Sequence, residues 1–231
     1  MRLRAIGAFS LFPDTYGVVF SDPVQFVVNA IYLVPGLLIG LIGHGLAQAA
    51  FAVARGDQTP RVDGRLSLDP SHHLDPLGTI AVFFINFGWA KEVRINPYRM
   101  RSLLDPALVA LAGPVANLLI AIVLSIPIKL ALGAGSFDPA WPPWRVLLVA
   151  FYLNVALAVI SLVPIPPLDG YTFLERLFRR RYGRLFARID AQRQLIQLAF
   201  VLLVLLTGIL GFLYLPVARL ILRLPPFAVG S

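Results

Sequence analysis

The sequence predicts an all-α integral membrane protein with about four transmembrane helices, a re-entrant or short hydrophobic segment and a small β-hairpin-like sheet. Of its 231 residues, 58% are hydrophobic and 14% are charged, whereas soluble domains carry about 25% charged residues. The hydrophobic residues form runs long enough to cross a bilayer, and most basic residues lie between these runs. The absence of cysteine excludes disulfides, thiolate zinc sites and a cysteine nucleophile.

Each predicted membrane helix reaches the roughly 20 residues that a helix needs to cross a hydrocarbon core about 30 Å thick. The predicted helices cover about residues 25–54, 105–133, 145–165 and 194–222. A shorter run at 77–90 is predicted to be re-entrant or interfacial. Pro13 and Asp14 interrupt the first apolar run, so we expect no cleavable signal peptide. We expect one membrane domain over 1–231, ending in the helix at 194–222.

The distribution of charge predicts the orientation. Residues 171–193 contain seven arginines, and residues 55–104 contain seven basic residues, so we expect both stretches on the cytoplasmic side. The 134–144 loop contains one charged residue, Asp138, and is expected outside, as is the N-terminus. The basic stretch Arg176–Arg193 is typical of contact with anionic lipids, which we favour over nucleic-acid binding.

Two polar residues are predicted to meet inside the membrane. His44 lies eleven residues before Arg55, or about 16 Å along a helix. The third span ends at the prolines of "SLVPIPPLDG", which cannot continue a helix, and Asp169 follows at once. Non-helical backbone and a carboxylate at this depth indicate a cavity and a functional site. The first and third spans run in the same direction, which allows His44 to approach Asp169.

Four sequence blocks carry a resemblance to a known family. They are "GDQTPRVDGRLSLDPSHHLDPLGT", "FGWAKEVRINPYRMR", "LVALAGPVANLLIA" and "LVPIPPLDG". In order and spacing the chain resembles the site-2 protease family of intramembrane zinc metalloproteases, in its small bacterial form, over residues 35–178. The resemblance implies a site-2 protease-like core (about 25–178) in a bacterial cytoplasmic membrane. In that family, the two histidines of H-E-x-x-H and the aspartate of N-x-x-P-x-P-x-L-D-G bind zinc. The glutamate activates water, and the asparagine helps to stabilise the oxyanion.

Position by position, this chain departs from the family pattern. His44 and Asp169 match the first and third zinc ligands. Gly45 stands in place of the general base, Gln48 in place of the second histidine and Ser161 in place of the asparagine. A glutamine amide is a neutral and weak zinc ligand, and Gly45 has no side chain that could accept a proton.

Other residues offer few replacements for the missing groups. The chain contains two glutamates, Glu92 in a basic stretch and Glu175 beside the arginine-rich loop. His72 and His73 lie in a polar loop, and His73 matches the family's H-x-D-P-x-G block, which gives it a structural place. Asn117 is predicted either to line the polar site or to join two helices. His44 can be explained by a hydrogen bond to Gln48 or Asp169 instead of by zinc.

These substitutions predict a catalytically inactive homologue that binds another membrane protein as a scaffold, regulator or accessory subunit. This interpretation expects no enzyme activity, no bound metal and a partner in the membrane. The alternative is a residual zinc metalloprotease that cleaves within the membrane, with His44 and Asp169 as ligands. The two interpretations differ in the metal content of the purified protein.

Small residues in the first span predict close helix packing. Gly36 and Gly40 form a G-x-x-x-G pair, and we expect Gly45 to let helices close over the site. Outside the helices, the alternation in "GRLSL" (64–68) and "EVRI" (92–95) predicts short strands, whose edge could accept an extended peptide.

Overall fold

The computed structural model describes residues 22–85, 89–207 and 209–223, and within them the chain is mainly helical. The expectation about a signal peptide concerns residues outside this part. The elements are α3 (Pro23–Ala54), α4 (Thr59–Val62), α5 (Pro70–His73), α6 (Pro76–Ile85), the 3₁₀ turn η1 (Pro97–Arg99), α7 (Asp105–Gly133), α8 (Pro142–Ser161), α9 (Asp169–Ala191), α10 (Arg193–Thr207) and α11 (Leu210–Arg223).

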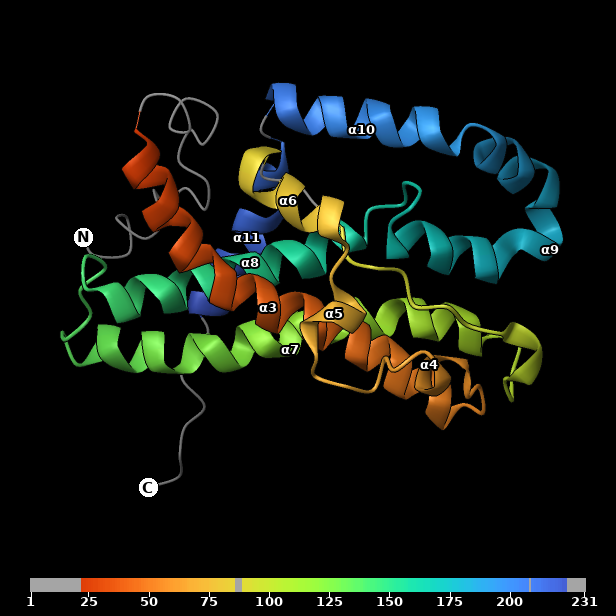
Figure 1. Cartoon of the computed structure of the whole chain (residues 1–231), viewed down its shortest axis with the longest axis horizontal. Helices are drawn as coiled ribbons and strands as arrows, with labels where there is room; N and C mark the ends of the chain where they lie inside the picture. The colour runs from red at the N-terminus through yellow and green to blue at the C-terminus, as the bar shows by residue number, and fades with distance from the viewer. Residues whose placement is uncertain (1–21, 86–88, 208, 224–231) are drawn as a thin grey trace.

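Three helices in the described part of the chain are long and apolar enough to cross a membrane: α3, α7 and α8. They correspond to the first three predicted spans. Figure 1 shows α7 and α8 side by side, with α3 crossing both. Asp22 caps α3 by accepting a 2.9 Å hydrogen bond from the Gln25 N–H, and Pro23 occupies the first helical position.

The predicted fourth span is not confirmed, because residues 194–222 form two shorter helices, α10 and α11. The break follows Thr207, whose hydroxyl donates to the Leu203 carbonyl and accepts from the Ile209 N–H. Such a side chain competes with the helix for backbone groups. α11 packs against α8, where the rings of Tyr214 and Tyr152 lie 6.5 Å apart between centroids.

The prediction of close packing at Gly36 and Gly40 is confirmed. A Cβ atom on Gly36 would lie 2.6 Å from Ala150 Cα, and one on Gly40 would lie 2.6 Å from Leu157 Cδ1. The glycines therefore let the backbone of α3 approach α8, as small residues do at membrane helix interfaces.

The predicted strands at 64–68 and 92–95 are wrong. The described residues contain one isolated antiparallel bridge, between Leu74 and Ala90. The side chain of Arg65 takes the place of a backbone ladder, because its guanidinium donates to the carbonyls of His72, Lys91 and Glu92. One buried side chain thus joins the two segments that a hairpin would have paired. The predicted re-entrant run begins as the short helix α6, and its residues 86–88 lie outside the described part.

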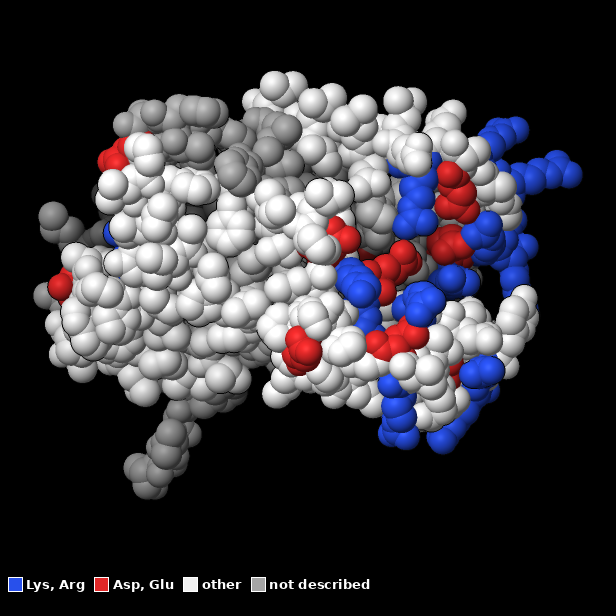
Figure 2. Space-filling model, in the orientation of Figure 1, with Lys and Arg blue, Asp and Glu red and all other residues white. Residues whose placement is uncertain are grey.

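The arginine-rich stretch is a helix, α9, and not a loop. Its backbone departs from helical geometry at Tyr182, and Tyr171 donates a 2.6 Å hydrogen bond to Asp190 across the bend. Figure 2 shows most of the basic side chains gathered at one end of the molecule, while the described surface over the long helices away from this end is mostly white. This separation agrees with a bundle whose charged end lies at a membrane surface.

Candidate functional site

A cavity of about 500 Å³ lies at the level where α8 ends and α9 begins. Its wall includes His44, Gly45 and Gln48 of α3, together with Ser161 and Asp169. The extended segment from Trp89 to Ile95 forms another part of the wall, and α11 contributes Leu210 and Tyr214. The expectation that Gly45 lets helices close over the site is therefore wrong, because Gly45 lines an open cavity.

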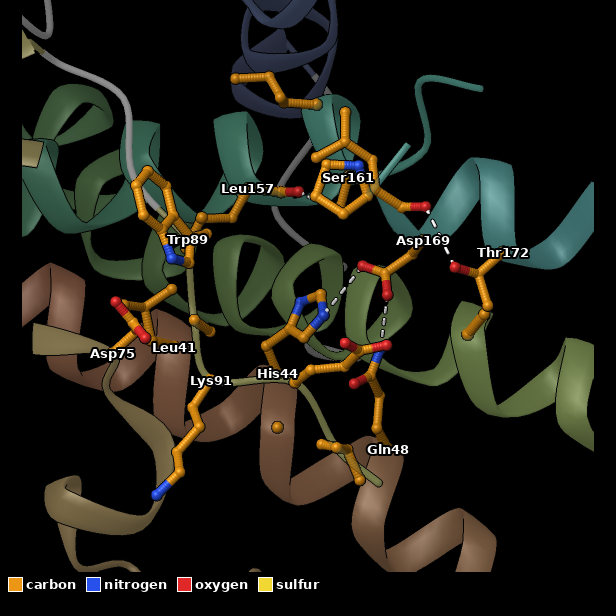
Figure 3. Close-up of a pocket in the computed structure, with 18 of the residues that line it drawn as sticks. Leu41, His44, Gln48, Asp75, Trp89, Lys91, Leu157, Ser161, Asp169 and Thr172 are labelled. Atoms are coloured by element: carbon orange, nitrogen blue, oxygen red, sulfur yellow. Dashed lines mark hydrogen bonds and ion pairs between the residues drawn. The ribbon is translucent and has the colours of Figure 1, made fainter. Parts of the chain in front are cut away.

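His44 and Asp169 meet at this cavity, as the sequence predicts. His44 Nε2 lies 3.1 Å from Asp169 Oδ2. The nonhelical turn at 162–168, where the prolines end α8, brings the first carboxylate of α9 back toward α3. Figure 3 shows His44 and Gln48 reaching from α3 toward Asp169.

A chain of amides determines which nitrogen of His44 carries its proton. The Asn117 amide nitrogen donates to the Gly40 carbonyl at 3.0 Å and to Asn154 Oδ1 at 3.1 Å. Asn117 Oδ1 is therefore an acceptor, and it lies 2.7 Å from His44 Nδ1. Nδ1 must be the donor, so a neutral His44 presents the lone pair of Nε2 to Asp169. Asn117 thus has the predicted role of joining helices, here three of them; it is fully buried behind His44 and is not among the residues that line the cavity.

Gln48 lies on the same face of α3, four residues after His44. Its amide nitrogen donates a 2.7 Å hydrogen bond to Asp169 Oδ1. The carboxylate of Asp169 therefore contacts both residues of α3, one with each oxygen. The prediction that His44 approaches Asp169 or Gln48 is confirmed as proximity to Asp169, while the ring hydrogen bond of His44 goes to Asn117; Gln48 belongs to the same cluster through Asp169.

The space beside Gly45 is taken by His73, not by a membrane helix. A Cβ atom on Gly45 would lie 2.8 Å from His73 Nδ1. His73 is fully buried, and Lys91 N–H donates to its carbonyl at 2.9 Å. The sequence assigned His73 a structural place in its loop, and gave no sign that its ring would contact Gly45.

Of the remaining candidates, Ser161 and Glu92 line the cavity, whereas Glu175 does not. The Ser161 hydroxyl donates to the Leu157 carbonyl within its own helix. Glu175 pairs with Arg179 and Arg176 on α9. Glu92 is exposed, on the segment that Arg65 holds in place.

Sequence reasoning missed two residues that shape the site. Asn154 is fully buried on α8 and accepts from Asn117. An asparagine in the middle of an apolar span was the available signal, because a buried amide needs partners. Gly113 of α7 lies against the His44 ring, so that a Cβ atom there would lie 2.2 Å from Nε2.

Zinc can be tested against this donor set. Two ligands bound at about 2.0–2.1 Å to one tetrahedral zinc ion lie roughly 3.3 Å apart, which is close to the 3.1 Å between His44 Nε2 and Asp169 Oδ2. With the Nδ1 proton directed at Asn117, these atoms are two acceptors facing each other, an arrangement that needs a proton or a cation between them. Gln48 can add a neutral third ligand if its amide oxygen turns inward. The described residues contain no cluster of three His, Cys, Asp or Glu ligands, so a zinc ion here would have two strong ligands, His44 and Asp169, and would need the neutral Gln48 amide as its third.

Comparison with known proteins finds several bacterial relatives. A Bacillus subtilis (strain 168) protein named "Putative zinc metalloprotease YwhC" is 35% identical over 159 residues, or 63% of this chain and 68% of that protein. Proteins named "Putative zinc metalloprotease Rip2" from Mycobacterium tuberculosis and Mycolicibacterium smegmatis are 30% and 31% identical over 72% and 66% of this chain. The chain spans 64% and 60% of those two proteins, a little under two thirds. No family model and no solved structure matches.

These relatives bear on two expectations, and they overturn one of them. The expectation that the chain is not an enzyme is wrong, because the relatives are named as zinc metalloproteases. The same names do not support the expectation that no metal is bound. A partner protein in the membrane and a scaffold or accessory role stay predictions.

Proposed function

Because the chain belongs to the site-2 protease family and is a multi-pass membrane protein, we propose that it is a zinc-dependent endopeptidase acting within or beside the membrane. Its substrates would be transmembrane or membrane-proximal peptide segments. The alternative interpretation of the sequence thus becomes the main one, with Gln48 and Gly45 as features of an unusual site.

The observation that carries the proposal is the approach of His44 to Asp169. Two acceptor atoms 3.1 Å apart are stable at membrane depth only if a positive charge lies between them. A proton would satisfy the pair, and so would a zinc ion. The relatives are named as zinc metalloproteases, which favours zinc over a proton.

Each residue would have a distinct role toward the metal. His44 and Asp169 would bind it, and Gln48 would complete the set through its amide oxygen. Asn117 would hold the His44 ring through Nδ1, the kind of outer hydrogen bond that fixes tautomer and orientation at metal sites. A bound zinc ion polarises a carbonyl group and lowers the pKa of bound water.

The cavity supplies a place for an extended substrate. Leu37, Leu41, Val109 and Tyr214 provide apolar walls, and the segment with Lys91 and Glu92 lies at its side. Apolar walls with a few converging polar groups are typical of binding sites. A peptide would enter with its scissile bond next to the His44–Asp169 pair.

The test uses the full chain in proteoliposomes with a transmembrane reporter. The wild type should cleave the reporter, and Asp169→Asn and His44→Asn should each lose cleavage and bound zinc. Asp63→Asn removes a carboxylate paired with Arg94 away from the cavity and should retain both. Equal cleavage by the wild type and Asp169→Asn would refute the proposal.

A further inference from the structure

One ring nitrogen of His73 is buried in the protein without a hydrogen bond among the described residues. The side chain is 0% exposed. Its Nε2 lies 2.7 Å from the carbonyl oxygen of Ser67, while its Nδ1 has no hydrogen-bond partner among the residues that the structure describes. Buried polar atoms are rarely left unsatisfied, and an exception calls for a ligand, a water molecule or a chemical role.

The Ser67 carbonyl determines which nitrogen of the His73 ring carries the proton. A carbonyl can only accept, so Nε2 carries the proton and Nδ1 presents a lone pair. The pKa of His73 lies below its ordinary value of 6.5, chiefly because of burial, and Arg65 and His72 lower it further while the Ser67 carbonyl and Asp69 oppose them. Near pH 7 the ring is therefore neutral, and Nδ1 is free to accept a proton.

The position of Nδ1 connects it to the proposed site. It lies 2.8 Å from the point where a side chain on residue 45 would begin, and Gly45 is part of the cavity wall next to His44. Residue 45 is where the family pattern has a proton-accepting carboxylate. His73 is not itself among the residues that line the cavity, and its buried Nδ1 lies behind Gly45, where glycine places no side chain between that atom and the cavity wall.

We propose that His73 is the general base of this enzyme and takes the place of the carboxylate missing at residue 45. The inference rests on the proposed function. Nδ1 accepts a proton from the attacking water through one further water that enters beside Gly45, a reach that general bases use. The water oxygen bonds to the peptide carbonyl carbon. The proton then passes from Nδ1 to the leaving nitrogen as the C–N bond breaks, which restores neutral His73.

Glu92 is the competing candidate, because its carboxylate also lines the cavity. It is exposed, on a segment that Arg65 holds through backbone carbonyls and not through the carboxylate. Its position therefore favours contact with substrate or solvent, whereas His73 is fixed beside Gly45.

The first experiment compares His73→Asn, Glu92→Gln and His72→Asn in proteoliposomes with a transmembrane reporter. His72 is the matched control, because its ring lies against Gly64 and not against Gly45. Loss of a general base typically costs 10²–10⁴-fold, so His73→Asn should lose that much cleavage while retaining zinc. The two other variants should stay within about threefold of the wild type. Cleavage by His73→Asn within that range, or an equal loss in Glu92→Gln, overturns the proposal.

If His73→Asn also loses zinc, a second pair of variants tests whether His73 is the general base. His73→Ala removes the ring that a Cβ on residue 45 would meet, so Gly45→Glu in that background should restore cleavage at least tenfold over His73→Ala alone. The acid limb of the pH profile of kcat/KM should also lie at lower pH than in the wild type, because a carboxylate replaces an imidazole as the base. No restoration, or an unmoved limb, overturns the proposal.

The protonation of the His73 ring can be measured without an activity assay. The chain has three histidines, so ¹⁵N-labelled histidine gives a simple NMR spectrum. One ring should be protonated at Nε2 and unprotonated at Nδ1 at pH 7, and its signal should vanish in His73→Asn. A His73 ring protonated at Nδ1 overturns the proposal. A wild type that retains this ring state but cleaves nothing would instead contradict the proposed function.

Discussion

The imidazole of His44 packs directly against the backbone of Gly113, with no room for a Cβ atom between them. A Cβ on Gly113 would lie 2.2 Å from His44 Nε2, the atom that faces Asp169. Gly113 therefore sets the position of the ring from the side of α7, while Asn117 of the same helix binds its other nitrogen. The helix α7 thus fixes His44 through one close contact and one hydrogen bond.

Gly113→Ala should displace the His44 ring and lower cleavage by about 10²-fold, the loss that a misplacement of about 1 Å can cause. Zinc affinity should fall with it. Gly133→Ala on the same helix is the matched control, since a Cβ there meets no atom of the described part of the chain within 4 Å. The measurement is reporter cleavage together with zinc titration, and unchanged zinc binding by Gly113→Ala would refute this role.

Asn117→Ala should weaken both the site and the fold. Removing a partner of a metal ligand typically costs 10–100-fold in metal affinity or activity. Asn154 Oδ1 and the Gly40 carbonyl also lose the N–H group that Asn117 donates to them inside the bundle, which should cost about 1–3 kcal/mol of stability. Asn29→Ala, which removes a hydrogen bond to Gln25 in α3, is the control. Thermal unfolding and zinc titration measure the two effects, and an effect on neither would contradict the network.

Asp57 should contribute stability that depends on pH. It is fully buried beyond the end of α3. Burial alone would raise its pKa, but hydrogen bonds from Thr59 and the Asn96 N–H outweigh burial and lower the pKa below 3.8. Its contribution is therefore complete above pH 3.8 and is lost as the pH falls through the lower folded value.

Asp57→Asn tests this dependence. The variant should unfold at a lower temperature at pH 7 and lose less stability than the wild type between pH 7 and about pH 3. Parallel pH curves for the two proteins would exclude Asp57 as the responsible group.

The basic helix α9 is expected to bind anionic lipids, as the sequence suggested for Arg176–Arg193. Arg180, Arg181 and Arg184 are exposed, and each basic residue near an anionic surface contributes about 1 kcal/mol. Changing all three to glutamine should weaken binding of added phosphatidylglycerol roughly 100-fold at low salt. Arg145→Gln, on α8 beside Tyr32, is the control. Equal lipid binding by all these proteins would contradict the expectation.

The sequence predicted the parts of the site that depend on helix direction and proline. Apolar run length identified α3, α7 and α8, and the prolines before Asp169 identified the turn that carries this residue back to His44. Helix spacing also placed Gln48 on the face of His44. These features follow from local backbone geometry, which can be predicted from the spacing of residues in one sequence.

The sequence did not predict the features that depend on contacts between distant loops. Arg65 joins two segments through its guanidinium, and alternation of residue types in those segments falsely suggested strands. The ring of His73 occupies the space beside Gly45, which no local pattern indicates. The substitutions at residues 45 and 48 suggested an inactive protein, because their effect was judged without the neighbours that surround them.

Reversible dependence of cleavage on zinc tests the central claim most directly. The wild-type protein in proteoliposomes should cleave a transmembrane reporter, stop after a chelator removes zinc and recover when zinc is added back. Asp169→Ala should stay inactive throughout, because it lacks the carboxylate that faces His44. Cleavage that persists without zinc, or a folded wild type that cleaves nothing with zinc bound, would contradict the account.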